Sequence, residues 1–297
     1  MNLSRERARP VDVAGVALII TSAAGFATLA IFGKLAFASG MTLPTMLTLR
    51  FAGAAALFWV ILAVTGAAAA WLGGRKVAAL LLMGGLGYAG QSTLYMVSVS
   101  LLPAAVVGML LYTYPMWVTL LAWWLHGDRP DRQRWLALLL ALGGTTLIAG
   151  APEGHINPLG IVTALLAGIW YAGYIVLGNR IIKGVAPLVS SAWILLGATI
   201  SFGVAGLILN QIRFDFPMPA GGLAVGGMIL LSTVIPVVTF LAGLQRVGPT
   251  QSALLSALEP VFTVALAVAF LGERLTGAQI AGSVLVITAV ILLQRRR

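Results

Sequence analysis

Long apolar runs, each of about 20 residues, follow one another along almost the whole chain. A helix rises about 1.5 Å per residue, so a run of this length can cross the hydrocarbon core of a bilayer. The 297 residues are 60% hydrophobic and only 9% charged, whereas a soluble domain carries about 25% charged residues. The sequence therefore predicts an all-α polytopic membrane protein with about ten transmembrane helices.

The expected spans lie between charged positions and Pro or Gly breaks, at 13–35, 43–66, 77–98, 103–126, 133–150, 158–179, 187–209, 221–245, 249–271 and 276–294. The connections are too short to hold a soluble domain, and no G-x-x-x-x-G-K-[ST] nucleotide loop occurs. We expect no metal or other cofactor, because the chain has no cysteine and its two histidines, His126 and His155, lie far apart without metal-ligand spacing.

The net charge of +10 does not indicate a nucleic-acid partner, because the basic residues gather in alternate connections. With the N-terminus inside, the inner segments hold Arg5, Arg7, Arg9, Arg75, Lys76, Arg129, Arg132, Arg134, Arg180, Lys183, Arg246 and Arg295 to Arg297. The outer side holds only Lys34, Arg213 and Arg274. This positive-inside pattern predicts that both termini lie in the cytoplasm and that the protein sits in the bilayer of a bacterial inner membrane.

The chain repeats itself at a constant offset of 145 residues. The clearest pairs are Pro115 with Pro260 and Gly127-Asp128-Arg129 with Gly272-Glu273-Arg274. We expect two repeats, 1–150 and 151–297, of five spans each. Because five is odd, the second repeat must enter the membrane with the opposite topology. Such inverted repeats are typical of transporters that bind a substrate near the middle of the membrane and open alternately to its two sides.

The second half ends in a recognisable pattern: Ala257-Leu258-Glu259-Pro260-Val261, then Leu271-Gly272-Glu273-Arg274-Leu275-Thr276 and Gln279-Ile280-Ala281-Gly282. This pattern resembles the closing signature of EamA-type members of the drug/metabolite transporter superfamily. Its counterpart in the first half is Tyr114-Pro115 with Gly127-Asp128-Arg129. The resemblance covers the whole chain and implies two five-helix repeats and a secondary transporter, most often an exporter of amino acids and other metabolites. The chain also resembles the YddG branch of aromatic amino acid exporters.

Polar and aromatic residues on one helix face are expected to point at protein or at a water-filled cavity, since polar groups are costly in hydrocarbon. Aromatic faces with a few polar groups suit a flat small-molecule substrate. The candidates for substrate binding are Tyr88, Gln91, Tyr95, Tyr112, Trp170, Tyr174, Thr239 and Ser256. The alternative for the serine and threonine residues is interhelical packing through hydrogen bonds.

Five further residues are candidates for coupling or gating. Glu259 is the only acidic residue well inside an expected span, and it would either carry a coupling proton or cap backbone N–H groups near Pro260. Arg50 lies about 10 Å into the second span by helix rise and would either attract a carboxylate or snorkel outward. Pro115, Pro236 and Pro260 interrupt their helices and are either bending points or permanent kinks.

The leading hypothesis is a secondary exporter of small metabolites, preferably amino acids and aromatic ones in particular. A broad-specificity drug or nucleobase exporter would use the same pocket residues. An intramembrane lipid-modifying enzyme would need paired carboxylates or His and Asp clusters at one membrane face, whereas the acidic residues here stand singly. A receptor or assembly factor would bind a ligand without moving it. The sequence leaves the oligomeric state open.

Overall fold

A computed structural model describes residues 12–66, 72–101, 107, 110–127, 129–149, 157–210, 212–213, 218–271 and 276–294. No strand occurs among these residues. The first half holds α1 (Val13–Ala27), α2 (Leu29–Ala38), α3 (Leu43–Thr65), α4 (Gly74–Leu82), η2 (Met83–Tyr88), α5 (Ala89–Leu101), α7 (Tyr114–His126) and α8 (Arg132–Ala149). The second half holds α9 (Pro158–Ile181), α10 (Pro187–Ile208), α11 (Met218–Ile229), η3 (Leu230–Val234), α12 (Ile235–Val247), α13 (Pro249–Ser256), α14 (Glu259–Leu271) and α15 (Gly277–Gln294).

Within the described residues, six helical stretches are long and apolar enough to cross a membrane. They are Val13–Gly33, Leu43–Thr65, Gly74–Tyr95, Pro158–Ile181, Pro187–Ile208 and Gly221–Val247. Of the other four expected spans, 103–126 is described as a regular helix only from Tyr114, and 249–271 is divided at Ala257–Leu258. The remaining two, α8 and α15, are 18 residues long. The count of ten spans stays a prediction.

Local signals set many of the helix ends. The Asp12 carboxylate accepts a hydrogen bond from the Gly15 N–H at 2.9 Å, and Asn157 caps α9 in the same way. Proline stands in the first turn of α3, α9, α10 and α13, where its missing N–H breaks no bond. Gly66 and Gly127 end α3 and α7 with φ of 69° and 72°, a left-handed conformation that favours glycine.

The offset of 145 residues read from the sequence recurs in the helix boundaries. Moved by 145 positions, α7 falls on α14 and α8 falls on α15, residue for residue. The two π-helical segments, in which the helix turn is widened by one residue, correspond in the same way: η2 overlaps η3 at this offset. Each half therefore carries the same irregularity in the same helix.

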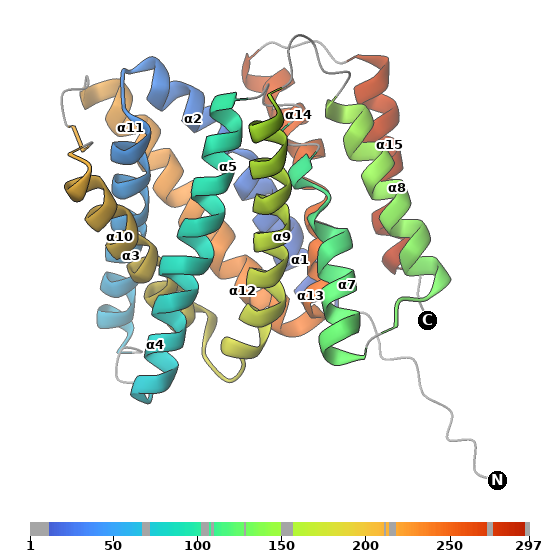
Figure 1. Ribbon diagram of the computed structural model, residues 1–297, viewed down its shortest axis with the longest axis horizontal. Helices are drawn as coiled ribbons and strands as arrows, with labels where there is room; N and C mark the ends of the chain where they lie inside the picture. The colour runs from blue at the N-terminus through green and yellow to red at the C-terminus, as the bar shows by residue number, and fades with distance from the viewer. Residues whose placement is uncertain are drawn as a thin grey trace.

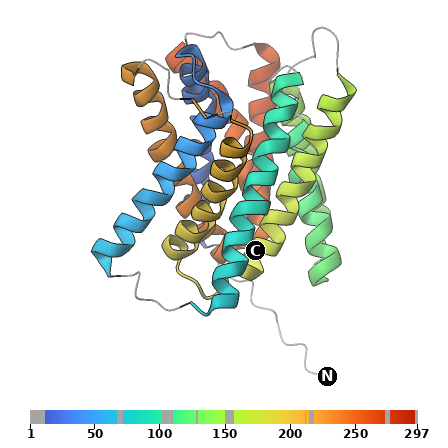
Figure 2. The same cartoon turned by 60° about the vertical axis from the view of Figure 1, so that its left-hand side comes forward.

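The helix packing also repeats with the halves exchanged. α1 packs along α12, and the equivalent helices α9 and α5 pack along each other. α3 pairs with its equivalent α10, and α8 pairs with its equivalent α15 at one side of the bundle (right in Figure 1). Figure 2 shows α3 (blue) and the continuous stretch of α4, η2 and α5 (cyan to teal) running along the length of the bundle. The two halves are thus interleaved.

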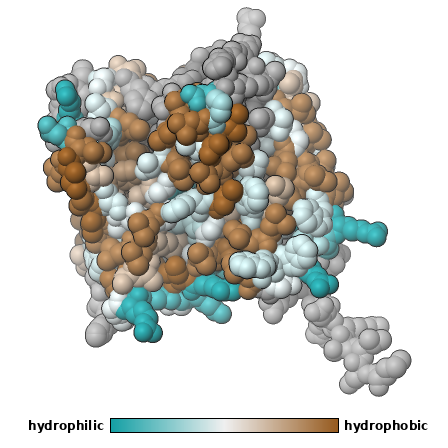
Figure 3. Space-filling view, viewed as in Figure 1, coloured by the Kyte–Doolittle hydropathy of each residue, from teal (hydrophilic) through white to brown (hydrophobic). Residues whose placement is uncertain are grey.

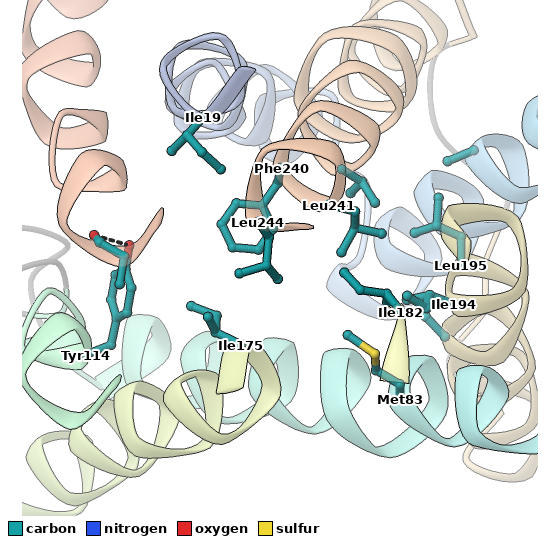
Figure 4. Packing of buried hydrophobic residues seen from close by; sticks show 14 of the residues in the cluster. Ile19, Met83, Tyr114, Ile175, Ile182, Ile194, Leu195, Phe240, Leu241 and Leu244 are labelled. Carbon is teal, nitrogen blue, oxygen red and sulfur yellow. Dashed lines mark hydrogen bonds between the residues drawn. The ribbon is translucent and has the colours of Figure 1, made fainter. Parts of the chain in front are cut away.

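The outer surface and the interior have different compositions. Hydrophobic side chains cover much of the face seen in Figure 3, and hydrophilic ones gather mainly near its lower edge. Inside, buried side chains from both halves meet, among them Ile19, Ile175, Leu241 and Leu244 (Figure 4), each with no exposed surface. Because lipid is as apolar as these side chains, close packing rather than exclusion from water must hold such a core together.

Small residues bring two backbones into contact where α10 crosses η2. A side chain added at Gly84 would overlap the Ile194 carbonyl, and one added at Gly197 would overlap the Leu81 carbonyl. Ser201 donates a hydrogen bond from its hydroxyl to the Gly85 carbonyl at 2.9 Å across the same contact. Glycine is therefore required here for the close approach of the helices.

Candidate functional site

All six tyrosines of the chain gather in one region of the interior, which we call the tyrosine cluster: Tyr88, Tyr95, Tyr112, Tyr114, Tyr171 and Tyr174. The ring centroids are 5.8 Å apart for Tyr88 and Tyr174, 6.0 Å for Tyr174 and Tyr171, 4.9 Å for Tyr171 and Tyr114, and 6.3 Å for Tyr114 and Tyr112. Tyr95 approaches Glu259 and Tyr112 closely enough to interact electrostatically. All but Tyr114 keep part of their surface accessible, so these rings do not form a solid core.

Glu259 lies at the tyrosine cluster as the first residue of α14. The Tyr112 hydroxyl lies beside the Glu259 carboxylate, and the other members in electrostatic reach of it are Tyr88, Tyr95, Tyr114 and Tyr171. The other acidic residues that the structure describes, Asp12 and Asp131, stand at the starts of α1 and α8. Within the described residues, the interior of the bundle therefore contains a single carboxylate.

Two helices are broken at equivalent positions beside this carboxylate. The turns are at Tyr112–Thr113 and at Ala257–Leu258, 145 residues apart, and each directly precedes the start of α7 or α14. At both breaks a backbone hydrogen bond joins residues three apart. One runs from the Thr113 N–H to the Leu110 carbonyl (3.3 Å), and the other from the Ala257 N–H to the Leu254 carbonyl (3.2 Å). Both breaks place a half-helix N-terminus, the positive end of its dipole, at the tyrosine cluster.

The prolines explain where these breaks fall. Pro115 and Pro260 stand second in α7 and α14, where proline is favoured because the first N–H groups of a helix have no partner. Pro236 differs, because α12 continues directly from η3 without a turn. Its missing N–H leaves the Ser232 carbonyl without its usual partner four residues on, and that carbonyl accepts a hydrogen bond from Arg50.

Arg50 neither snorkels outward nor lies open to the tyrosine cluster, since only 3% of its surface is exposed. Its Nε donates to the Thr233 hydroxyl at 2.6 Å and its Nη2 to the Ser232 carbonyl at 3.2 Å. The Tyr88 side chain lies close enough to interact with it electrostatically. Its guanidinium carbon also lies 5.0 Å from the centre of the Phe51 ring. The structure therefore excludes outward snorkelling, and attraction of a carboxylate by Arg50 stays a prediction.

The hydroxyl-bearing candidates are used mainly in packing. Thr239 donates to the Ile235 carbonyl at 2.8 Å within its own helix. Ser256 is buried beside Tyr114, whose hydroxyl donates to the Ala253 carbonyl at 3.3 Å. Ser256 thus packs against a ring of the cluster. Gln91 is half-buried on α5 between Tyr88 and Tyr95.

Trp170 lies outside the tyrosine cluster. Its ring packs against Gly90, its indole N–H points to the Gly87 carbonyl at 3.0 Å, and 47% of its surface is exposed. It shares the outer face of α9 with the exposed Leu166 and Ile169. A helix turns by about 100° per residue, so the next residue, Tyr171, takes the inward direction instead.

Sequence reasoning missed Tyr171 and did not place Tyr114 among the substrate-binding candidates. The available signal was the distribution of tyrosine itself, because every tyrosine falls inside an expected span. Transmembrane proteins usually place this residue at the membrane interfaces. Some residues singled out in the sequence lie outside the described residues. They are residues 272–275 of the EamA-like closing pattern, Asp128 of its counterpart in the first half, and His155. Among those described, no group of three or more His, Cys, Asp or Glu side chains could hold a metal ion.

Comparison with known proteins identifies relatives across the whole chain. The EamA-like transporter family matches twice, at residues 13–150 and 158–295. An uncharacterized transporter of Synechocystis is 33% identical over 66% of this chain and 60% of its own length, and the transporter YcbK of Bacillus subtilis is 26% identical over 91% and 89%. The threonine/homoserine exporter RhtA of Salmonella typhimurium is 28% identical over 70% and 68%. A solved crystal structure shares the fold, with a TM-score of 0.79 at 21% identity over 94% of this chain and 96% of that one.

Proposed function

We propose, on the premise that this chain belongs to the EamA-like transporter family, that it exports amino acids or closely similar metabolites across a bacterial inner membrane. The observation that carries the proposal is the tyrosine cluster, in which five of the six tyrosines lie in electrostatic reach of the single described interior carboxylate, Glu259, at two helix breaks. A relative of this chain is named a threonine/homoserine exporter, which supports an amino acid as the class of substrate.

The chemistry of the cluster matches both charged groups of an amino acid. Ring faces and the Glu259 carboxylate attract an ammonium group. The N-terminal ends of α7 and α14 offer a positive potential and free N–H groups to a carboxylate. The rings can stack on an aromatic side chain in offset or edge-to-face arrangements, which favours phenylalanine, tyrosine or tryptophan as substrates. Candidate contacts within the cluster are Tyr88, Tyr95, Tyr112 and Tyr174, with Tyr171 added from the structure.

Transport would proceed by alternating access of two inverted five-helix repeats, ten spans in all, with both termini in the cytoplasm. Support comes from the matching helix boundaries at an offset of 145 residues and from the packing that recurs with the halves exchanged. Two similar halves can exchange their conformations around a fixed central site. Glu259 is the residue we assign to proton coupling, because an isolated interior carboxylate can bind either a proton or a cationic substrate.

A broad-specificity exporter of drugs or nucleobases is the second candidate. The observation that favours it is the aromatic character of the site, since six tyrosine rings also suit a flat base or a planar cation. The two candidates differ in the order of substrates, because an amino acid exporter must prefer solutes that carry both an ammonium and a carboxylate group.

The test is uptake of labelled phenylalanine and threonine into liposomes that contain the purified protein. Unlabelled amino acids, nucleobases and planar cationic drugs are added as competitors. Saturable uptake that other amino acids inhibit most strongly is the expected result. Inhibition by nucleobases or drugs with no effect of amino acids would favour the second candidate, and the absence of any uptake would contradict amino acid export.

A further inference from the structure

Arg50 contacts both halves of the protein at positions that correspond to each other. It donates a hydrogen bond to Thr233, in η3, and lies close to Tyr88, the last residue of η2. These two residues are 145 positions apart, the offset that relates the two halves. The position equivalent to Arg50 itself is Leu195, which is buried and apolar. A single cation therefore serves both π-helical segments.

The local structure of η3 is suited to accept this cation. Pro236 has no N–H to offer the Ser232 carbonyl, and this carbonyl accepts from the Arg50 Nη2. The Thr233 hydroxyl donates to the Met228 carbonyl at 2.8 Å and accepts from the Arg50 Nε at 2.6 Å. The widened turn and the proline thus expose two acceptors towards α3. π-helical turns of this kind are common at functional positions.

Charge balance makes this contact different from ordinary packing. Arg50 is almost completely buried, and among the described residues no carboxylate forms an ion pair with it. A buried guanidinium held only by neutral acceptors and a ring face is costly unless every one of these contacts is kept. Arg50 lies on α3 in the first half, and its hydrogen bonds to Ser232 and Thr233 reach η3 in the second half. Movement of one half relative to the other would break these bonds, so the contact is sensitive to the relative position of the halves.

The contact also reaches the tyrosine cluster directly. Tyr88 lies close to Arg50 at one side, and its ring centroid lies 5.8 Å from that of Tyr174 at the other. The Phe51 ring packs edge-on against Tyr88 at 5.1 Å and stacks on Phe202 at 5.3 Å, which fixes the direction of the tyrosine. A substrate that shifts Tyr88 would therefore shift a partner of Arg50.

We infer that Arg50 is a positioning residue that ties η2 to η3 and couples the tyrosine cluster to the relative position of the two halves. This inference rests on the proposed function in one respect, because alternating access is the movement that the tie controls. Substrate contact is not part of the role: Arg50 acts through Tyr88 and Thr233, and these bonds must rearrange each time the site changes sides.

The test uses the absence of cysteine from the chain, which allows a single reporter to be introduced. Ile182→Cys replaces a fully buried residue between α9 and α10. The rate at which a maleimide reagent modifies this cysteine measures how often the part of the bundle around residue 182 opens. We expect Arg50→Gln to increase the rate of labelling by about tenfold or more, since it removes charge-assisted hydrogen bonds. Thr233→Val should act in the same direction, and adding it to Arg50→Gln should change little, because both variants break one contact.

Ser22→Ala is the matched control. The Ser22 hydroxyl donates to the Pro236 carbonyl at 2.8 Å between α1 and α12, so this variant removes a buried interhelical hydrogen bond nearby without touching Arg50. Equal labelling rates in Arg50→Gln and in the protein that carries only the reporter would overturn the inference, as would an equal increase in Ser22→Ala. If Arg50→Gln does not fold, Thr233→Val with the same control decides the question.

Labelling needs no substrate, so it separates this inference from the proposed function. With labelled phenylalanine as the probe, we expect Arg50→Gln to reduce flux about tenfold while its Kd for the amino acid stays within about threefold. A Kd raised by the same factor as the loss of flux would show that Arg50 binds the substrate, and would overturn the positioning role. Failure of all uptake would refute amino acid export and leave the labelling result to decide on Arg50.

Discussion

The Tyr112 hydroxyl lies beside the Glu259 carboxylate, within interaction distance, and the two residues stand at helix breaks that occupy equivalent positions of the two halves. The equivalent of Glu259 is Tyr114, so only one half supplies the charge. Two nearly symmetric breaks thus form an asymmetric site, with a carboxylate on one side and tyrosine hydroxyls on the other. We expect this arrangement to give a substrate with one cationic group a defined orientation between the halves.

Removal of the Tyr112 hydroxyl tests this contact. Tyr112→Phe keeps the ring and removes only the hydroxyl that lies beside the Glu259 carboxylate. We expect flux of labelled phenylalanine to fall by about tenfold or more, with little change in thermal stability. Trp170→Phe is the matched control, because Trp170 lies on the outer face of α9. Loss of flux in both variants to the same extent would contradict the assignment of Tyr112 to the site.

Tyr171 was not predicted as a substrate contact and provides an independent test of the cluster. Its ring lies 4.9 Å from that of Tyr114 and 6.0 Å from that of Tyr174, so Tyr171→Leu removes the central ring of the series. An aromatic pair contributes about 0.5–1.5 kcal/mol beyond buried area. We expect the Kd for phenylalanine to rise several-fold and that for threonine to change less. Equal changes for both amino acids would exclude ring stacking as the cause.

Close packing of η2 and α10 can be tested by adding one methyl group. Gly84→Ala places a Cβ against the Ile194 carbonyl, and the two backbones must separate. Overpacking of this kind typically costs about 1–3 kcal/mol, so we expect a lower melting temperature and less monodisperse protein in detergent. Gly173→Ala adds the same methyl group where nothing lies within 4 Å. A melting temperature equally reduced in both variants would refute the packing argument.

The inverted topology predicts opposite sides for two exposed positions. Lys183 lies between α9 and α10, and Arg213 lies beyond the end of α10. Single cysteines at these positions, in a chain that otherwise has none, are treated with a membrane-impermeant maleimide in intact cells. We expect Arg213→Cys to be labelled directly and Lys183→Cys only after permeabilisation. The reverse pattern would place both termini outside.

The 145-residue repeat could be predicted from the sequence, because residues with strong backbone effects carry it. Pro115 and Pro260 gave the offset of 145, and the helix boundaries around them coincide in the structure. The π-helical segments could not be predicted, since a widened turn depends on contacts such as those of Thr233 with Met228 and Arg50. These contacts join residues far apart in the chain.

The candidate site was predicted only in part, for a geometric reason. Helix periodicity placed Tyr88, Tyr95 and Tyr174 on inward faces, but it cannot tell the inward face from the outward one where both carry aromatic residues. Trp170 and Tyr171 are neighbours in α9. The tryptophan ring packs against Gly90, where the lack of a side chain leaves room for it on the outer side. For Arg50, the depth within the span did not predict where the side chain points. Its guanidinium points to acceptors in η3, at Ser232 and Thr233, which are far away in the sequence.

The most direct test of the account is amino acid flux through reconstituted protein that carries Glu259→Gln, with Asp131→Asn as the matched control. Both variants remove one carboxylate charge, but Asp131 stands at the start of α8, where its carboxylate accepts a hydrogen bond from the Arg134 N–H that asparagine can also accept. With labelled phenylalanine and an imposed pH gradient, we predict saturable flux that the gradient accelerates in the unaltered protein and in Asp131→Asn, and that is lost in Glu259→Gln. Equal, gradient-dependent flux in all three proteins would contradict the role of Glu259 and of the tyrosine cluster around it.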